Sequence, residues 1–190
     1  EDRRVRHLRL EPAGLQHGAQ LGGLRAAGPA LGARVVDAEG VRDLERDVVP
    51  LANDQQLAIL PWSPLAGGFL SGKYTRAGAG PDGARRVAFD FPPVNKERAY
   101  DIIDVMATIA AERNATVAQI ALAWLFHQPH VTSVILGART AEQLAANLAA
   151  TNVVLSSDDL QKLNTVSTLP SEYPGWMLER QGGDRRAQIS

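Results

Sequence analysis

Two short, uncharged and largely apolar runs constrain the fold of this chain more than any other feature. They are Leu57–Trp62 and Val131–Leu136. Runs of this length and composition are typical of buried strands, and helical patterns fill the sequence between them. Strands that alternate with helices pair in parallel, because a parallel connection needs a crossover of a dozen or more residues. The sequence therefore predicts an α/β fold with parallel strands.

Helical periodicity covers most of the remaining sequence after Val41. Lys96–Arg113 has apolar residues at helical spacing, and Asn114 is a suitable stop. Thr116 and Gln119 have the spacing of a capping box for a following helix. The other predicted elements are helices over Asp43–Ala52 (with Leu44, Val48 and Leu51 on one side), Thr140–Ala150 and Ser157–Leu169, a surface loop over Gly78–Pro93, and an irregular tail from Pro170.

Residues 1–40 differ from the rest in composition. They are rich in Gly, Ala and Arg and contain no Phe, Tyr or Trp. Their glycines interrupt every helical face, and each costs a helix interior about 1 kcal/mol. Only Arg4–Leu10 and Ala33–Ala38 suggest strands. We therefore expect two parts, a divergent segment over 1–40 and a regular domain over 41–190.

Charge and cysteine content exclude several classes of protein. The net charge is −1 and there is no cysteine, so disulfides, thiolate metal sites and a cysteine nucleophile are absent from this sequence,. The arginines at 3, 4, 6 and 9 lack interleaved aromatic residues and suggest a solvated end rather than a nucleic-acid surface. No apolar stretch reaches the roughly 20 residues that span a bilayer. We expect a cytoplasmic protein that binds neither nucleic acid nor membrane.

The turn after the first run suits an anion. Ser63 offers a hydroxyl, Pro64 fixes the turn, and the residues Leu65, Ala66, Gly67 and Gly68 offer consecutive backbone amides,. Lys73 adds a point charge for phosphate, and Trp62 a flat face for an aromatic ring. The alternative is a strand, a proline turn and a helix start without a ligand.

The turn after the second run also suits an anion. Gly137 ends the run, Thr140 is a helix N-cap, and Arg139 has the fork geometry that binds phosphate,. Gln143 and Asn147 lie on consecutive turns of one helix face. The alternative is that Gln143 completes a capping box and Asn147 is a solvated surface residue.

These two segments, SPLAGGFLSGKY and VILGARTAEQLAANL, together resemble the C-terminal part of the aldo-keto reductases. RDLERDVVPLA, FDFPPVNKER, VAQIALAWLF and YPGWMLER extend the resemblance from about Val41 to the end. It implies the C-terminal part of a (β/α)8 barrel, an incomplete barrel whose seventh and eighth strands are the two runs. It also implies a site for NADP(H) at the C-terminal ends of the strands.

The resemblance assigns the cofactor contacts residue by residue. The pyrophosphate side falls to Trp62, Ser63, Pro64, Leu65, Ala66, Gly67 and Lys73, and the adenosine 2′-phosphate and adenine to Gly137, Arg139, Gln143 and Asn147. Arg139 is the reason to expect NADPH rather than NADH. Arg85 or Arg86 is expected to close over the cofactor.

The family's catalytic set is a tyrosine assisted by lysine, aspartate and histidine, all from the first half of the barrel. Tyr74, Tyr100 and Tyr173 match none of the required contexts, so no catalytic residue is assigned. We expect Tyr74 to pack or touch the cofactor edge, Tyr100 to lie on a helix surface, and Tyr173 to belong to the tail. His127 and His130 have metal-like spacing but lack a third ligand nearby.

The start of the chain also departs from the family pattern. Glu11 and Pro12 follow the run Arg4–Leu10 where a Ser-Asn pair is expected, and a Gln of the sixth strand is not recognisable before Val41. We hypothesise that residues from about Leu8 to Gly40 were translated out of frame. The other two reading frames of the gene decide this, since one of them must encode the Ser-Asn pair.

The whole enzyme is expected to reduce an aldehyde or ketone to an alcohol, whereas this chain alone is expected to be inactive. A non-enzymatic NADPH-binding regulatory subunit of the same fold is the alternative, and a barrel enzyme with another phosphorylated ligand is a third possibility. Open strand edges predict self-association and poor solubility. A monodisperse monomer that melts cooperatively would contradict that expectation.

Overall fold

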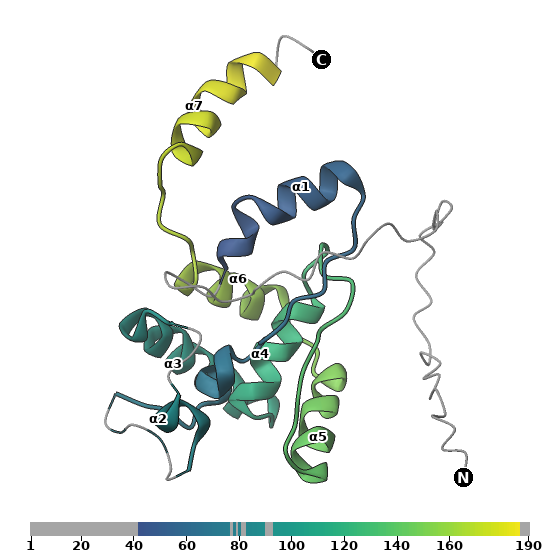
Figure 1. The fold of residues 1–190 in the computed structure, drawn as a ribbon, viewed down its shortest axis with the longest axis vertical. Coiled ribbons are helices and arrows are strands. Elements are labelled where there is room, and N and C mark those ends of the chain that lie inside the picture. Colours follow the sequence, from purple (N-terminus) through teal and green to yellow (C-terminus); the bar gives the residue numbers. More distant parts are fainter. Residues whose placement is uncertain (1–41, 77, 79, 81–82, 90–92, 187–190) are drawn as a thin grey trace, which may run out of the picture.

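The computed structural model describes residues 42–76, 78, 80, 83–89 and 93–186 (Figure 1). The predicted strands Arg4–Leu10 and Ala33–Ala38, the arginines near the start, and the boundary at residue 40 lie outside these residues. The described elements are helices and short 3-10 turns, in the order η1 (Asp43–Glu45), α1 (Val48–Gln55), η2 (Ala66–Ser71), α2 (Arg85–Ala88), α3 (Lys96–Arg113), α4 (Val117–Phe126), α5 (Ala141–Leu148), η3 (Ala149–Asn152), α6 (Ser157–Val166) and α7 (Gly175–Arg186).

The bounds predicted for α3 and the cap predicted for α4 are confirmed. The Asn95 side chain accepts a hydrogen bond from the backbone N–H of Arg98 at the start of α3, and Asn114 ends the helix in the left-handed conformation with φ of 50°. Thr116 and Gln119 form the reciprocal capping box of α4,. These signals are local, so the sequence contains all that is needed to find them.

The prediction of one continuous helix over Asp43–Ala52 was wrong. The structure divides it into η1 and α1, and α1 begins only at Val48. Pro50 explains the division, because in a continuous helix its ring would clash with the carbonyl of Arg46, whereas the first turn of a helix tolerates proline. The predicted apolar side was also wrong in part, since Leu51 is 51% exposed and Ala52 is buried instead.

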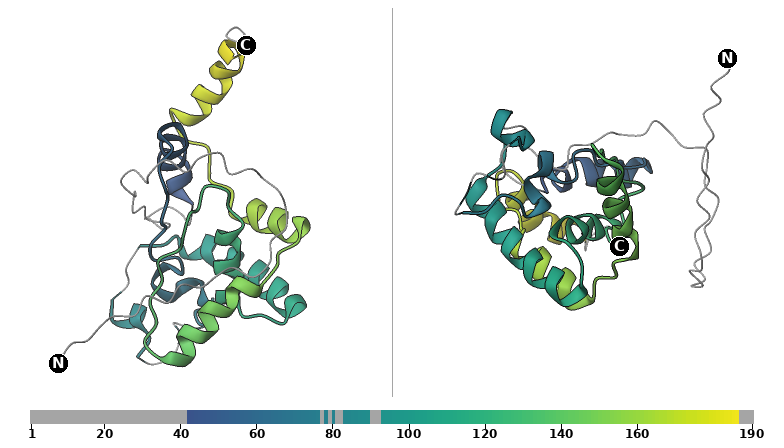
Figure 2. Two further views of the ribbon diagram at one scale, coloured as in Figure 1. Left: turned by 90° about the vertical axis from the view of Figure 1, so that its right-hand side faces the viewer. Right: turned by 90° about the horizontal axis from the view of Figure 1, so that it is seen from below.

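The prediction of an irregular tail from Pro170 was wrong. Residues Gly175–Arg186 form α7, which stands away from the other helices in two perpendicular views (Figures 1 and 2). Pro174 immediately precedes the helix, a position where a proline does not interrupt helical hydrogen bonds. Two other predicted ends also shift, because α6 ends at Val166 and η3 follows α5 after Leu148.

The two apolar runs lie side by side and point in the same direction. Parallel bridges join Ile59 to Val131 and Trp62 to Ile135. The backbone N–H of Thr132 donates to the carbonyl of Ile59 at 2.9 Å, and that of Ile135 donates to the carbonyl of Pro61 at 3.0 Å. The predicted parallel pairing is therefore observed between these two runs.

The two runs pair through single bridges rather than the continuous strands that the sequence predicts. Pro61 has no N–H to donate to a ladder. The N–H of Ile59 instead donates to the side-chain hydroxyl of Thr132, at 3.3 Å. Among the residues that the structure describes, no longer ladder is formed.

Apolar faces of α3, α4 and α6 meet to form the core that supports this edge. Ile102, Met106 and Ile109 of α3 are buried, as are Ile120 of α4 and Leu163 of α6. η2 packs against α4, so the same core holds the turn after Trp62. None of the helices in the described ranges combines the length and apolar content needed to cross a membrane.

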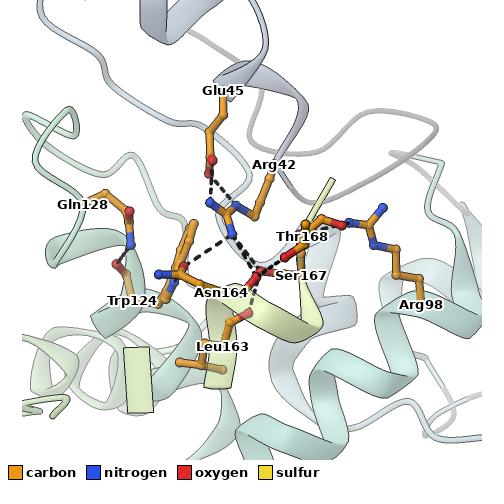
Figure 3. Close-up of polar contacts among 9 residues, drawn as sticks. All are labelled: Arg42, Glu45, Arg98, Trp124, Gln128, Leu163, Asn164, Ser167 and Thr168. Atoms are coloured by element: carbon orange, nitrogen blue, oxygen red, sulfur yellow. Dashed lines mark hydrogen bonds and ion pairs between the residues drawn. The ribbon is translucent and has the colours of Figure 1, made fainter. Parts of the chain in front are cut away.

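Arg42 joins η1 to the end of α6 (Figure 3). Its Nε donates to Glu45 at 2.6 Å, and its Nη1 donates to the Ser167 hydroxyl at 3.2 Å. The guanidinium also lies over the ring of Trp124, 5.1 Å from the centroid. The indole N–H of Trp124 in turn donates to the side-chain oxygen of Asn164, at 3.0 Å.

Replacing Arg42 with alanine is expected to lower the free energy of unfolding by about 1–2 kcal/mol, because several charge-assisted hydrogen bonds are lost from a half-buried position. Urea titration followed by circular dichroism measures the change. Arg180→Ala, in exposed α7, is the matched control and should change stability by less than about 0.5 kcal/mol. Equal values for the two variants would show that Arg42 does not hold η1 to α6.

Candidate cofactor site

The candidate site lies at the edge where the two paired runs end. Because Trp62 pairs with Ile135 in parallel, the turn that starts at Ser63 and the turn that starts at Gly137 leave the same edge. The carboxyl ends of neighbouring parallel strands are where α/β folds bind ligands. The two segments that the sequence predicted to act together are thus neighbours in space.

The turn after Trp62 has an unusual backbone. Ser63 and Ala66 have φ of 56° and 52°, in the left-handed region that residues with a Cβ rarely adopt, and Gly67 and Gly68 follow with φ of 65° and 92°. Each such non-glycine residue costs about 1–2 kcal/mol. Other parts of the structure must therefore hold this turn in place.

Three of the four backbone amides that were expected to face a ligand, those of Ala66, Gly67 and Gly68, instead donate within the turn. The N–H of Ala66 donates to the carbonyl of Ser63 and that of Gly68 to the carbonyl of Leu65, both at 2.8 Å. The N–H of Gly67 donates to the hydroxyl oxygen of Ser63 at 3.2 Å. What the turn offers a ligand is therefore the hydroxyl hydrogen of Ser63 rather than three consecutive amides.

Side chains around this turn differ in their accessibility. Pro64 and Ala66 are buried, while Trp62, Ser63 and Leu65 are half-buried. Pro64 and Ala66 are therefore inaccessible to a ligand, whereas part of the Trp62 side chain remains accessible.

Lys73 brings a positive charge to the turn. The side chain is exposed, and its ammonium lies 5.4 Å from the centroid of the Tyr74 ring. It also passes close to Gly68, where a Cβ atom would be only 3.1 Å from Nζ. Gly68 therefore leaves room for the lysine to lie against the turn.

The second segment presents exposed polar side chains at the start of α5. Thr140 caps the helix by accepting the N–H of Gln143 at 3.2 Å, as predicted. The Gln143 side-chain oxygen accepts the N–H of Arg139 at 3.0 Å rather than that of Thr140, so the box that would be the alternative to ligand binding is not formed. Gly137, Arg139 and Gln143 are exposed and Asn147 is half-buried.

Glu142 is a residue of this segment that sequence reasoning missed. Its own backbone N–H and the hydroxyl of Thr140 lower the pKa of its carboxyl group. The carboxylate therefore lies in the first turn of α5, where a negative charge is favourable,.

Arg86, one of the two arginines expected to close over a ligand, is buried in this structure. Arg86 is only 6% exposed, and its Nη1 donates to the carbonyl of Ala66 at 2.7 Å, beneath the turn. The side chain of Arg85 lies outside the described part of the chain.

Aromatic residues pack beneath the turn. Tyr74 is buried and stacks on Phe69, with ring centroids 5.4 Å apart, which confirms that it packs. Tyr100, on α3, also packs against Phe69, at 5.3 Å, so it is half-buried rather than fully on the helix surface as the sequence predicted. Tyr173 is 71% exposed just before α7.

The two histidines have local roles. The Nδ1 atom of His127 lies 2.7 Å from the carbonyl oxygen of Ala123. For His130, burial lowers the pKa, the charge of Glu45 opposes this, and Arg42 lowers it further. Within the described residues no three potential ligands gather as a metal site would require.

A family model for the Aldo/keto reductase family matches residues 36–168. The chain belongs to the aldo/keto reductase family. The match includes both paired runs and the helices between them, so it supports the resemblance that those segments suggested. YPGWMLER, in the tail, lies beyond it.

Bacterial oxidoreductases are similar to this chain over about two thirds of its length. The uncharacterized oxidoreductase YrpG of Bacillus subtilis is 34% identical over 125 residues, 66% of this chain and 36% of the relative. An NADH-specific methylglyoxal reductase of Escherichia coli is 33% identical over 118 residues, 62% of this chain and 36% of the relative. The chain thus spans little more than a third of the length of these relatives.

A solved aldo/keto reductase structure shows the fold. The glycerol dehydrogenase of Gluconobacter oxydans superposes with a TM-score of 0.54 at 23% identity, over 70% of this chain and 42% of that protein. The family and this likeness place the chain in the (β/α)8 barrel fold, with the described bridges as neighbouring parallel strands of that barrel.

Proposed function

We propose that this chain carries the cofactor-binding part of an oxidoreductase that reduces small aldehydes or ketones to alcohols with NADPH. The observation that carries the proposal is the parallel pairing of Trp62 with Ile135, which brings the Ser63 and Gly137 turns to one edge in an aldo/keto reductase. Because the chain spans 36% of the length of each of these two relatives, the reaction itself is proposed for the whole protein.

The available side chains fit a dinucleotide phosphate. The Ser63 hydroxyl and the exposed Lys73 ammonium suit the pyrophosphate, since one donates a hydrogen bond and the other a point charge,. Arg139 suits a second phosphate because a guanidinium binds it in bidentate fashion. Gln143 and Asn147 suit the adenine, since their amides lie one helical turn apart.

The bound cofactor would supply the hydride, and the chain would supply binding and orientation. The described tyrosines do not offer a proton donor at this edge. The Tyr74 hydroxyl accepts the backbone N–H of Arg86 at 3.3 Å beneath the turn, and Tyr100 and Tyr173 lie on α3 and before α7. The proton donor therefore belongs to the remainder of the barrel in this proposal.

Replacing Arg139 with alanine is expected to raise the Kd for NADPH about 10- to 100-fold and to leave the Kd for NADH within about twofold, because only NADPH carries the 2′-phosphate. Isothermal titration of the chain with each cofactor measures both values. Arg139→Lys should retain part of the NADPH affinity, since lysine keeps the charge but not the fork. Arg180→Ala is the control for loss of a surface charge.

Three outcomes would contradict the proposal in different ways. Equal losses for the two cofactors would show that Arg139 does not contact the 2′-phosphate. A wild-type chain that prefers NADH, as the name of the Escherichia coli relative describes for that protein, would overturn the choice of NADPH. Binding of neither cofactor would overturn the assignment of this edge as a cofactor site.

A regulatory role is the second candidate function. A probable voltage-gated potassium channel subunit beta of Arabidopsis thaliana is 34% identical over 115 residues, 58% of this chain and 35% of that protein. In this alternative the same edge binds the cofactor, but the whole protein responds to it by acting on a partner. A protein that includes the first half of the barrel, binds NADPH tightly and reduces no aldehyde or ketone would favour this role.

A further inference from the structure

Arg86 reaches the candidate site from beneath, and its position is unusual for an arginine. It belongs to the short helix α2, twenty residues after the turn that it contacts, and only 6% of its surface is exposed. Burying a guanidinium is unfavourable unless its hydrogen bonds and charge are satisfied inside the protein. The groups that surround the buried Arg86 guanidinium therefore show what the side chain does.

Three contacts of Arg86 within the described residues involve the turn and the aromatic rings that pack against it. Its Nη1 donates to the carbonyl of Ala66 at 2.7 Å, and its guanidinium carbon lies 5.2 Å from the centroid of the Phe69 ring. Its backbone N–H donates to the hydroxyl of Tyr74 at 3.3 Å, and the Tyr74 ring stacks on Phe69 with an interplanar angle of 6°. Arg86, Phe69 and Tyr74 thus form one packed unit that we call the Arg86 support.

The atom that the Arg86 support binds belongs to a strained residue. Ala66 has φ of 52° although it carries a Cβ, and such a conformation persists only where surrounding contacts hold it,. The hydrogen bond from buried Arg86 fixes the position of the Ala66 carbonyl. The next two amides then close the turn onto Ser63 and Leu65.

We propose that Arg86 is a positioning residue that forms the cofactor turn before any ligand binds. It fixes Ala66, which fixes the hydrogen bond between Gly67 and the Ser63 hydroxyl oxygen and the place of Gly68 beside Lys73. The effect on cofactor affinity rests on the proposed function, but the effect on the turn does not. A preformed turn raises the affinity for the cofactor, because its backbone has already lost conformational entropy during folding and loses little more on binding.

The test compares Arg86→Ala and Arg86→Lys with the wild-type chain. Arg76→Ala is the matched control, because Arg76 comes from the same connecting segment but its guanidinium pairs with Glu97 and Asp101 on the exposed face of α3. Hydrogen–deuterium exchange of each chain without cofactor reports the turn over residues 63–70 and the core helices separately. Isothermal titration with NADPH reports the Kd.

Arg86→Ala is expected to speed amide exchange over residues 63–70 at least tenfold while exchange in α3 and α4 stays within twofold. Its Kd for NADPH should rise at least tenfold, and Arg86→Lys should give intermediate values for both. Arg76→Ala should match the wild type in the turn and in Kd. Unchanged exchange of the turn in Arg86→Ala would overturn the proposal.

Two further outcomes are also decisive. If Arg86→Ala also speeds amide exchange in α3 and α4, the result for Arg86→Lys decides the question. Faster exchange in the turn, α3 and α4 together in Arg86→Lys would overturn a role confined to the turn. If the wild-type chain binds no NADPH, the proposed function fails, whereas faster exchange confined to the turn would still support Arg86 as the residue that forms it.

Discussion

Replacing Asp159 with alanine is expected to lower the free energy of unfolding by about 3 kcal/mol, the largest loss from a polar substitution that we predict here. Asp159 is 1% exposed at the start of α6, where it and Ser156 form a capping box. Its carboxylate accepts the N–H of Ser156 at 2.8 Å and pairs with the guanidinium of Arg113 on α3. The substitution removes both the carboxylate half of the capping box and the ion pair that joins α6 to α3.

The same residue predicts a pH dependence. Burial by itself raises the pKa of the Asp159 carboxyl group, but the hydrogen bonds from Ser156 and the charge of Arg113 outweigh it, so that the pKa is lowered overall. A carboxyl group with a lower pKa in the folded state stabilises the protein above its unfolded pKa. This contribution is lost as the pH falls through the folded pKa.

Thermal melting of the wild type and Asp159→Asn from neutral to acidic pH measures this contribution. The wild type should lose stability in acid, and the difference between the two proteins should shrink there. Asp158→Ala is the matched control, because Asp158 is exposed and pairs with Lys162 along one face of α6. A pH dependence in Asp159→Asn as steep as in the wild type would assign the acid sensitivity to another group.

Replacing Gly80 with alanine is expected to lower the free energy of unfolding by about 2–4 kcal/mol through a clash and backbone strain acting together. Gly80 has φ of +90°, and a Cβ there would lie 2.5 Å and 2.6 Å from two ring atoms of Tyr74. Tyr74 cannot move aside freely, because its ring is buried and stacked on Phe69.

A second glycine of the same loop separates the two causes. Gly83 also has a positive φ, of +71°, but a Cβ there would have open space around it. Gly83→Ala should therefore cost only the backbone strain, about 1–2 kcal/mol. Denaturant titration measures both variants, and near-ultraviolet circular dichroism reports the packing of Tyr74. Equal losses of unfolding free energy for Gly80→Ala and Gly83→Ala would show that the Tyr74 ring moves aside without cost.

Local signals made much of the helical structure predictable. Periodic apolar residues and the caps at Thr116 and Asn114 define α3 and α4 within a few residues of chain. The break at Pro50 and the helix after Pro174 were missed because one proline has opposite effects inside a helix and at its start. The parallel pairing followed from the order of elements, whereas its reduction to single bridges depends on the Thr132 hydroxyl, which pattern alone does not place.

The candidate site was also predictable only in part. Residue types at the two turns indicated an anion site, and the parallel bridges bring those turns to one edge. The use of the amides depends on the φ angles of Ser63 and Ala66, which no composition rule gives. The direction of Arg86 depends on contacts between residues twenty positions apart, so the sequence identified the arginine but not what it binds.

The separation of α7 from the other helices has a thermodynamic consequence. A twelve-residue helix that stands clear of the core must draw its order mainly from its own backbone, and helices of that length are marginal in water,. Heating should thus melt α7 gradually, before the rest collapses in one step. In a Trp176→Phe variant, whose remaining tryptophans Trp62 and Trp124 lie outside α7, far-ultraviolet circular dichroism and tryptophan fluorescence would then trace two different curves, and a single transition temperature would describe only the second.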